Sequence, residues 1–168
     1  MVGRAGREYQ EFAAARGAHL FRTACLLTGG DWHLAEDLVQ ETLAKMYCSW
    51  RRINRDSSPV AYANTVLTRT FLSYRRKRSS SERPSEWMPE RVGRSDDAEL
   101  RLTLLEGLAR LSAKDRAVLV LRYWEDRSVE ETAEVLRVSP GAVRTQSLRA
   151  LRRLRAVLGD QLAELALR

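Results

Sequence analysis

Apolar residues in the first part of the chain recur at the three- and four-residue spacing of amphipathic helices. One helix is predicted from about Tyr9 to Leu27, ending at the run Thr28-Gly-Gly-Asp31 because glycine tolerates a positive φ. A second helix is predicted over about residues 35–50. The two apolar stripes consist of Phe12, Ala15, His19, Leu20, Ala24 and Leu27, and of Ala35, Leu38, Val39, Thr42, Leu43, Met46, Tyr47 and Trp50. We therefore expect these two helices to pack face to face.

A third helix is predicted from near Val60, after the helix breaker Pro59, to about Arg78. Its apolar stripe consists of Val60, Ala63, Val66, Leu67, Thr70, Phe71 and Tyr74. The helix ends in four consecutive basic residues, 75–78. We expect this third helix to complete an N-terminal helical domain over residues 1–78.

The next segment, SSSERPSEWMPERVGRSDD (79–97), is rich in Ser, Pro and charge and has no apolar period. This composition predicts an exposed, flexible linker between residues 1–78 and residues 98–168. Trp87 and Met88 are exceptions within it, and they could either anchor the linker on a surface or dock a partner.

Four more helices are predicted after the linker. The first carries Leu100, Leu104, Leu105, Leu108 and Leu111. The second and third each begin with a capping box, Ser112 with Asp115 in place of the usual Glu or Gln, and Ser128 with Glu131. Their inward residues are Ala117, Val118, Leu121 and Tyr123, and Val129, Thr132, Ala133 and Leu136. Since no run alternates with period two, the predicted fold class is all-α, with two small helical domains.

The last two helices are joined only by the short turn Arg137-Val138, so they should cross steeply as a helix-turn-helix over about Ser128–Arg155. Arg137 stands where many such turns have Gly for its positive φ. Ser139 as N-cap and Pro140 as first helical residue begin the second helix, which should enter the major groove. Its inward residues are Val143, Ser147, Ala150, Leu151, Leu154 and Leu158, and its outward residues are Arg144, Thr145, Leu148, Arg149, Arg152 and Arg153.

The charge of the chain favours a polyanionic partner. Twenty-nine Lys and Arg against 22 Asp and Glu give a formal charge of +7, which by itself fits nucleic acid or an anionic membrane. From Arg137 to Gly159 there are six arginines and no acidic residue, whereas a merely solvated helix face would mix signs. Arginines can bond guanine edges or phosphates, Thr145 can bond either, and Leu148 could touch a thymine methyl. The outward face is therefore predicted to bind double-stranded DNA.

Other kinds of chemistry find little support. Cys25 and Cys48 lack the paired spacing and histidine partners of a zinc site, so we expect two reduced cysteines, no metal and no cofactor. His19 and His33 have no Ser or Cys partner in a catalytic pattern, and no glycine-rich phosphate loop follows a strand, so we expect no enzyme. The start lacks the apolar segment of a secretory signal and no stretch could cross a bilayer, so we expect a cytoplasmic protein.

Three stretches together resemble a bacterial sigma factor of the extracytoplasmic function (ECF) group of the sigma-70 family, in particular its actinobacterial SigE-like subgroup. LTGGDWHLAEDLVQETLAKMYCSW (27–50) is similar to region 2.1–2.2, and PVAYANTVLTRTFLSYRRKR (59–78) to later parts of region 2. LARLSAKDRAVLVLRYWEDRSVEETAEVLRVSPGAVRTQSLRALRRLR (108–155) is similar to region 4. The resemblance implies a transcription initiation factor that gives promoter specificity to core RNA polymerase.

The resemblance also implies a role for each part. In the family the region 2.2 helix docks on the clamp helices of the largest polymerase subunit, which corresponds here to Asp37, Gln40 and Glu41, whereas the residues alone would suggest a solvated face. The following helix and the loop before it melt the promoter and hold a flipped −10 base, for which the candidates are Tyr62, Asn64, Arg69, Arg75 and Arg76. The −35 contacts fall on Arg144, Thr145, Leu148, Arg149 and Arg152.

The chain departs from the family pattern mainly in the −10 segment. A Trp common early in that helix is replaced by Val60-Ala61-Tyr62, and a frequent Asn aligns near Thr68 or Arg69, so the −10 base preference cannot be read. The implied partners are core RNA polymerase, including the flap of its second largest subunit, promoter DNA, and an anti-sigma factor. The alternative is a stand-alone helix-turn-helix regulator whose N-terminal helices sense a ligand or dimerise.

Overall fold

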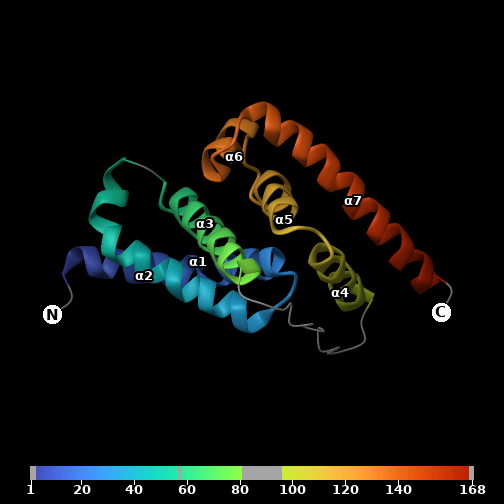
Figure 1. Cartoon of the computed structure of the whole chain (residues 1–168). Coiled ribbons are helices and arrows are strands. Elements are labelled where there is room, and N and C mark those ends of the chain that lie inside the picture. The colour runs from blue at the N-terminus through green and yellow to red at the C-terminus, as the bar shows by residue number, and fades with distance from the viewer. Residues whose placement is uncertain (1–2, 57, 81–95, 167–168) are drawn as a thin grey trace.

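The computed structural model describes residues 3–56, 58–80 and 96–166, and in these ranges the chain is helical without any strand. The helices are α1 (Arg4–Thr28), α2 (Trp32–Asp56), α3 (Pro59–Ser80), α4 (Asp96–Ala109), α5 (Ala113–Leu119), α6 (Val129–Leu136) and α7 (Pro140–Ala166), with a π-helical turn η1 (Val120–Trp124) continuing α5 (Figure 1). The predicted all-α class is confirmed. No helix in the described ranges is long and apolar enough to cross a membrane.

Helices α1, α2 and α3 pack into an N-terminal bundle. Its core contains Leu20, Leu27, Met46, Trp50, Leu67 and Phe71. The predicted packing of α1 on α2 is confirmed, but two members of the predicted stripes are exposed. Ala15 is exposed because the buried side chains of α1 begin only at Leu20. Tyr47 is 61% exposed, and its ring lies edge-on against the Tyr9 ring with the centroids 5.1 Å apart.

The helix ends in this bundle follow local chemistry. Gly29 and Gly30 adopt φ of 65° and 90°, and Gly30 N–H donates to the Cys25 carbonyl, which ends α1 at the predicted point. Helix α1 begins earlier than expected, at Arg4. Pro59 is the first residue of α3 rather than a breaker before it, since the first helical residue needs no N–H partner.

Helices α4 to α7 form a C-terminal block in which the long α7 packs against α4, α5 and α6. Leu108, Leu111, Leu119 and Ala150 form its apolar cluster. Leu100 and Leu104, predicted as part of the α4 stripe, are 54% and 37% exposed, because the α4 residues packed here lie near its C-terminal end. Gly107 shows this close packing, since an added Cβ would lie 3.1 Å from a methyl carbon of Leu158.

The caps of the C-terminal block agree only in part with the sequence. The box of Ser128 and Glu131 is complete, with both hydrogen bonds at 3.0 Å. At α5 only half of the predicted box forms, because Ser112 caps the Asp115 N–H while the Asp115 carboxylate turns to α7. Tyr123, predicted to point inward, is 57% exposed because the π-helical turn changes the helical register before it.

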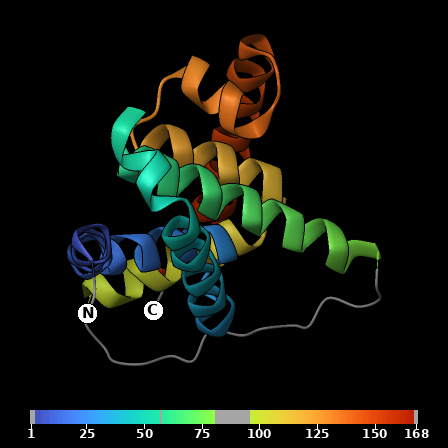
Figure 2. The ribbon, with the colours of Figure 1, turned by 90° about the vertical axis from the view of Figure 1, so that its left-hand side faces the viewer.

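The two halves of the molecule lie against each other. Ala117 and Val120 of the C-terminal block belong to the same apolar cluster as Leu67 and Phe71 of the N-terminal bundle. In Figure 2, α3 runs beside α5, as their contacts require. The predicted linker 79–97 overlaps the end of α3 and the start of α4, and Trp87 and Met88 lie outside the described residues.

Candidate nucleic-acid interface

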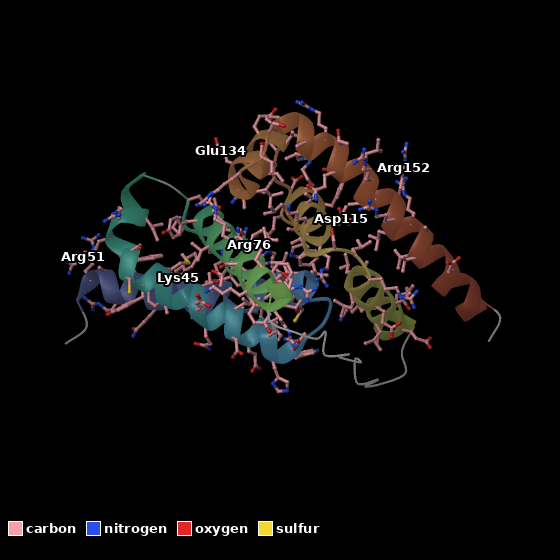
Figure 3. All side chains as sticks on the ribbon, in the orientation of Figure 1. Lys45, Arg51, Arg76, Asp115, Glu134 and Arg152 are labelled. Atoms are coloured by element: carbon pink, nitrogen blue, oxygen red, sulfur yellow. The ribbon has the colours of Figure 1, made fainter. Side chains whose placement is uncertain are left out.

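The outer face of α7 presents the residues predicted to read duplex DNA. Arg137 adopts φ 56° at the end of α6, and Ser139 Oγ accepts a hydrogen bond from Ala142 N–H at 3.1 Å, so that α7 begins directly after a short turn. The side chains of Arg144, Thr145, Leu148, Arg149 and Arg152 are all exposed. Figure 3 shows Arg152 on the side of α7 that points away from the rest of the protein. The helix-turn-helix and its outward face agree with the prediction.

Behind this face, a buried carboxylate connects α5 to α7. Asp115 Oδ2 lies 2.5 Å from Arg153 Nη1, and Gln146 Nε2 lies 3.5 Å from Asp115 Oδ1. These groups line a hollow of about 420 Å³ together with Thr145 and Arg149. Arg153 is predicted to face outward with the other arginines, but its guanidinium turns sideways to the carboxylate, although it remains 59% exposed.

The five candidate −10 residues on α3 divide into two groups. Arg75 and Arg76 are exposed, and Tyr62 is half-buried. Asn64 is only 3% exposed, and its Nδ2 donates to Glu125 Oε2 at 2.7 Å. Arg69 donates to the backbone carbonyls of Glu134 and Val135 at 3.0 and 3.1 Å.

Asn64 and Arg69 of α3 both bond to the C-terminal block. Partial burial and the charge of Arg137 lower the pKa of the Arg69 guanidinium, although arginine keeps its proton at neutral pH. The structure therefore places Arg75 and Arg76 together in solvent and places Asn64 and Arg69 in a contact between the two halves.

Comparisons with known proteins divide the chain into the same N-terminal and C-terminal parts as the structure. Residues 14–81 match the family described as sigma-70 region 2, and residues 101–154 match the family described as sigma-70, region 4. The chain is 38% identical to the RNA polymerase sigma-E factor of Streptomyces coelicolor over 155 residues, covering 90% of this chain and 86% of the relative. The chain belongs to the sigma-70 family. It is a sigma factor with region 2 in the N-terminal bundle and region 4 in the C-terminal block.

Further relatives place it among ECF sigma factors. The ECF sigma factor SigL of Mycobacterium tuberculosis is 32% identical over 162 residues, covering 90% of this chain and 87% of SigL. Among solved structures, the sigma factor RpoE from Bartonella quintana, crystallised with the anti-sigma factor NepR, superposes with a TM-score of 0.71 at 25% identity. The superposition covers 91% of this chain and 98% of that RpoE.

The region 2 residues predicted to bind polymerase lie on α2. Asp37, Gln40 and Glu41 are all exposed on the face opposite the bundle core. Glu41 also pairs with Lys45 at 2.8 Å, an exposed i, i+4 contact that contributes little to stability. The exposure agrees with a docking surface and equally with a solvated face, so this role stays a prediction.

Sequence reasoning missed the residues that join region 2 to region 4. Glu125 lies in the short stretch Trp124-Glu-Asp-Arg127, which reads as an ordinary polar loop, yet its side chain is only 6% exposed. Sequence reasoning also missed Asp115, predicted only as a helix cap, whose carboxylate joins α5 to α7 within region 4. No local signal could have identified them, because the partners of Glu125 lie at least 61 positions away in the sequence. In the described parts of the chain, no cluster of His, Cys, Asp and Glu could hold a metal ion.

Proposed function

We propose that this sigma factor binds core RNA polymerase and directs promoter-specific initiation, with region 4 reading the −35 element and region 2 reading and melting the −10 element. The observation that carries the proposal is the coexistence of both matched regions with an outward arginine face on α7. An exposed row of cations on a recognition helix supplies both phosphate contacts and guanine readout. The chain would perform no covalent chemistry itself.

The −35 contacts are proposed for Arg144, Thr145, Leu148, Arg149 and Arg152. Their spacing along α7 gives a continuous face that can lie in the major groove, with α6 bracing it from behind. The −10 contacts are proposed for Tyr62, Asn64, Arg69, Arg75 and Arg76. The exposed pair in this second set would follow the phosphates of the single strand, and aromatic stacking would hold an unpaired base.

The proposed partners are core polymerase, promoter DNA and an anti-sigma factor. Asp37, Gln40 and Glu41 would meet the clamp helices of the largest subunit, and region 4 would meet the flap of the second largest. A sigma factor acts where polymerase acts, so we place the protein in the cytoplasm. We also propose that the functional division follows residues 1–78, 79–97 and 98–168.

Reconstituted transcription tests this function. Purified protein should give promoter-dependent transcripts when added to core polymerase on genomic DNA, and sequencing those transcripts would identify its promoters. The protein alone should bind duplex promoter DNA only weakly. If it shifts a specific duplex by itself and gives no transcript with core enzyme, the stand-alone regulator is the correct alternative.

A further inference from the structure

A buried carboxylate of region 4 is held by three side chains of region 2. Glu125 Oε1 accepts a hydrogen bond from Thr23 Oγ1 at 2.6 Å and lies 2.9 Å from His19 Nε2, while Oε2 accepts from Asn64 Nδ2 at 2.7 Å. Because these three partners come from α1 and α3, the Glu125 side chain serves the contact between regions. We call this group of four residues the Glu125 latch.

Neighbouring residues extend the contact on both sides of the Glu125 latch. The Trp124 ring stacks on His19 with an interplanar angle of 7° and centroids 5.7 Å apart, and its Nε1 donates to Thr23 Oγ1 at 3.0 Å. Arg127 Nη2 donates to the Ala61 carbonyl at 2.7 Å. Charge-assisted and buried hydrogen bonds of this kind are specific in geometry, so they fix one arrangement of region 4 on region 2.

This arrangement occupies part of the −10 surface. Glu125 and the carbonyls at the end of α6 take up donors of Asn64 and Arg69, which are two of the five proposed −10 contacts. The carboxylate also places a negative charge where a phosphate would have to approach. A DNA strand could use these two residues only after region 4 has moved away.

The same contact contains an unfavourable feature. Arg116 of α5 is 3% exposed, its guanidinium lies 5.5 Å from the centre of the Phe71 ring of α3, and its Nε is buried without a hydrogen-bond partner among the described residues. Burial and the nearby charge of Arg75 lower the pKa of Arg116 to about 10. Separating the regions would return this cation to water and relieve its repulsion from Arg75. The closed form therefore carries an energetic cost, which makes closure reversible.

From these contacts we infer that region 4 is a reversible intramolecular cover of the −10 surface of region 2, held closed by the Glu125 latch. The inference rests on the proposed function of that surface. In the closed form the free protein withholds Asn64 and Arg69 from DNA. A partner that binds the separated regions more tightly than the closed form shifts the population towards the open one.

The first experiment measures closure directly, without DNA or polymerase. Spin labels are placed on exposed Cys48 in region 2 and on Gly159→Cys in region 4, in a Cys25→Ala background, and the distance distribution is recorded by double electron–electron resonance. The labelled parent should give one narrow distribution. Adding Glu125→Ala should broaden it and shift it to longer distances, with unchanged helical circular dichroism.

Two further variants make the result specific. Asp126→Asn removes the same charge one residue away, at an exposed position with φ 52° that asparagine tolerates, and should keep the narrow distribution. Glu125→Gln keeps the shape but removes the charge and replaces one carboxylate oxygen by an NH2 group, which then opposes the donor of either Thr23 or Asn64, so it should weaken closure without leaving a cavity. A Glu125→Ala or Glu125→Gln distribution identical to the parent would overturn the inference.

The second experiment asks whether opening uncovers the −10 surface. The probe is a fluorescent single-stranded DNA of randomised sequence, about 12 nucleotides long, which lies within the usual single-strand site sizes. It is titrated with unlabelled full-length protein. If the open form makes up about a tenth of the wild-type protein, Glu125→Ala should bind about tenfold more tightly, because the population penalty disappears. Opening without any gain in DNA affinity would show that region 4 does not cover this surface, and would also overturn the inference.

The two proposals fail in different ways. If the regions open as expected but neither wild type nor variant gives a promoter-dependent transcript with core polymerase, the proposed function is wrong while closure by Glu125 stands. If transcription is promoter-dependent but the distance distributions of wild type and variants coincide, the function stands and the intramolecular cover does not.

Discussion

The two surfaces proposed to bind DNA differ in how freely their side chains are available. On α7, all five proposed −35 residues are exposed, and the contacts that support the helix come from behind the reading face. On α3, two of the five proposed −10 residues are bonded to region 4. A duplex needs a rigid, preformed face, whereas a melted strand can be admitted after a rearrangement. The difference suggests that access to DNA is controlled at the −10 surface.

The largest predicted effect concerns the −35 surface. Arg149→Ala should cost about 1–3 kcal/mol of promoter affinity in the holoenzyme, because a bidentate base or phosphate contact is lost. Arg144→Ala should fall near the lower end of that range, since Arg144 already pairs with Glu130 at 3.6 Å. Binding of holoenzyme to duplex promoter fragments measures both. Arg155→Ala, which removes the same charge further along α7, is the control, and equal losses in all three variants would contradict base reading by α7.

The second prediction tests the exposed half of the −10 surface. The double variant Arg75→Ala/Arg76→Ala should weaken open-complex formation and reduce the slope of log K against log salt by about 1.4, from two lost phosphate contacts to a single strand. Permanganate footprinting of the melted promoter at several salt concentrations gives this slope. Arg16→Ala/Arg22→Ala removes two exposed charges from α1 instead and should leave the slope unchanged.

The third prediction concerns the support behind α7. Asp115→Asn should lower the free energy of unfolding by about 1–2 kcal/mol, because a buried charged hydrogen bond is lost while the exposed end of Arg153 remains solvated. Urea denaturation followed by circular dichroism measures the change. Asp160→Asn, at an exposed position on α7, should be neutral, and an equal effect of both changes would rule out a specific role for the Asp115–Arg153 pair.

The smallest predicted effect concerns the buried cation between the regions. Arg116→Met should leave the free energy of unfolding unchanged or raise it by up to about 1 kcal/mol, since an apolar side chain of similar length needs no desolvation of charge. The same urea experiment measures it, with exposed Arg110→Met as the comparison. A loss of several kcal/mol would mean that the Arg116–Phe71 contact stabilises the interface instead of weakening it.

Much of the fold could be predicted from sequence because it depends on local chemistry. Helix ends are set by Gly29, by the capping box of Ser128 and Glu131, and by the Ser139 cap, each of which acts within four residues. The α7 face was also predictable, because a helical period and the sign of its charges define it. Errors arose where tertiary packing decides, as at exposed Tyr47.

The contact between regions could not be predicted in the same way. The Glu125 latch joins residues from three separate segments of the chain, and a glutamate in a polar turn carries no mark of burial. Asn64 and Arg69 were predicted for one role, and nothing in their local sequence indicates that region 4 bonds to both. Such long-range hydrogen bonds depend on how two folded parts meet, which residue patterns within one helix do not encode.

The direction of the Glu125 side chain depends on the number of residues in the π-helical turn η1. Wide turns of this kind hold about one residue more than an α-helical turn, and here the wide turn ends immediately before the glutamate. Deleting a single residue within Val120–Trp124 would return the segment to α-helical spacing and rotate the Glu125 side chain by about 100° around the helix axis. In related chains, a change in the length of this turn would make or break the contact between region 2 and region 4, even if Glu125 and all of its partners were retained.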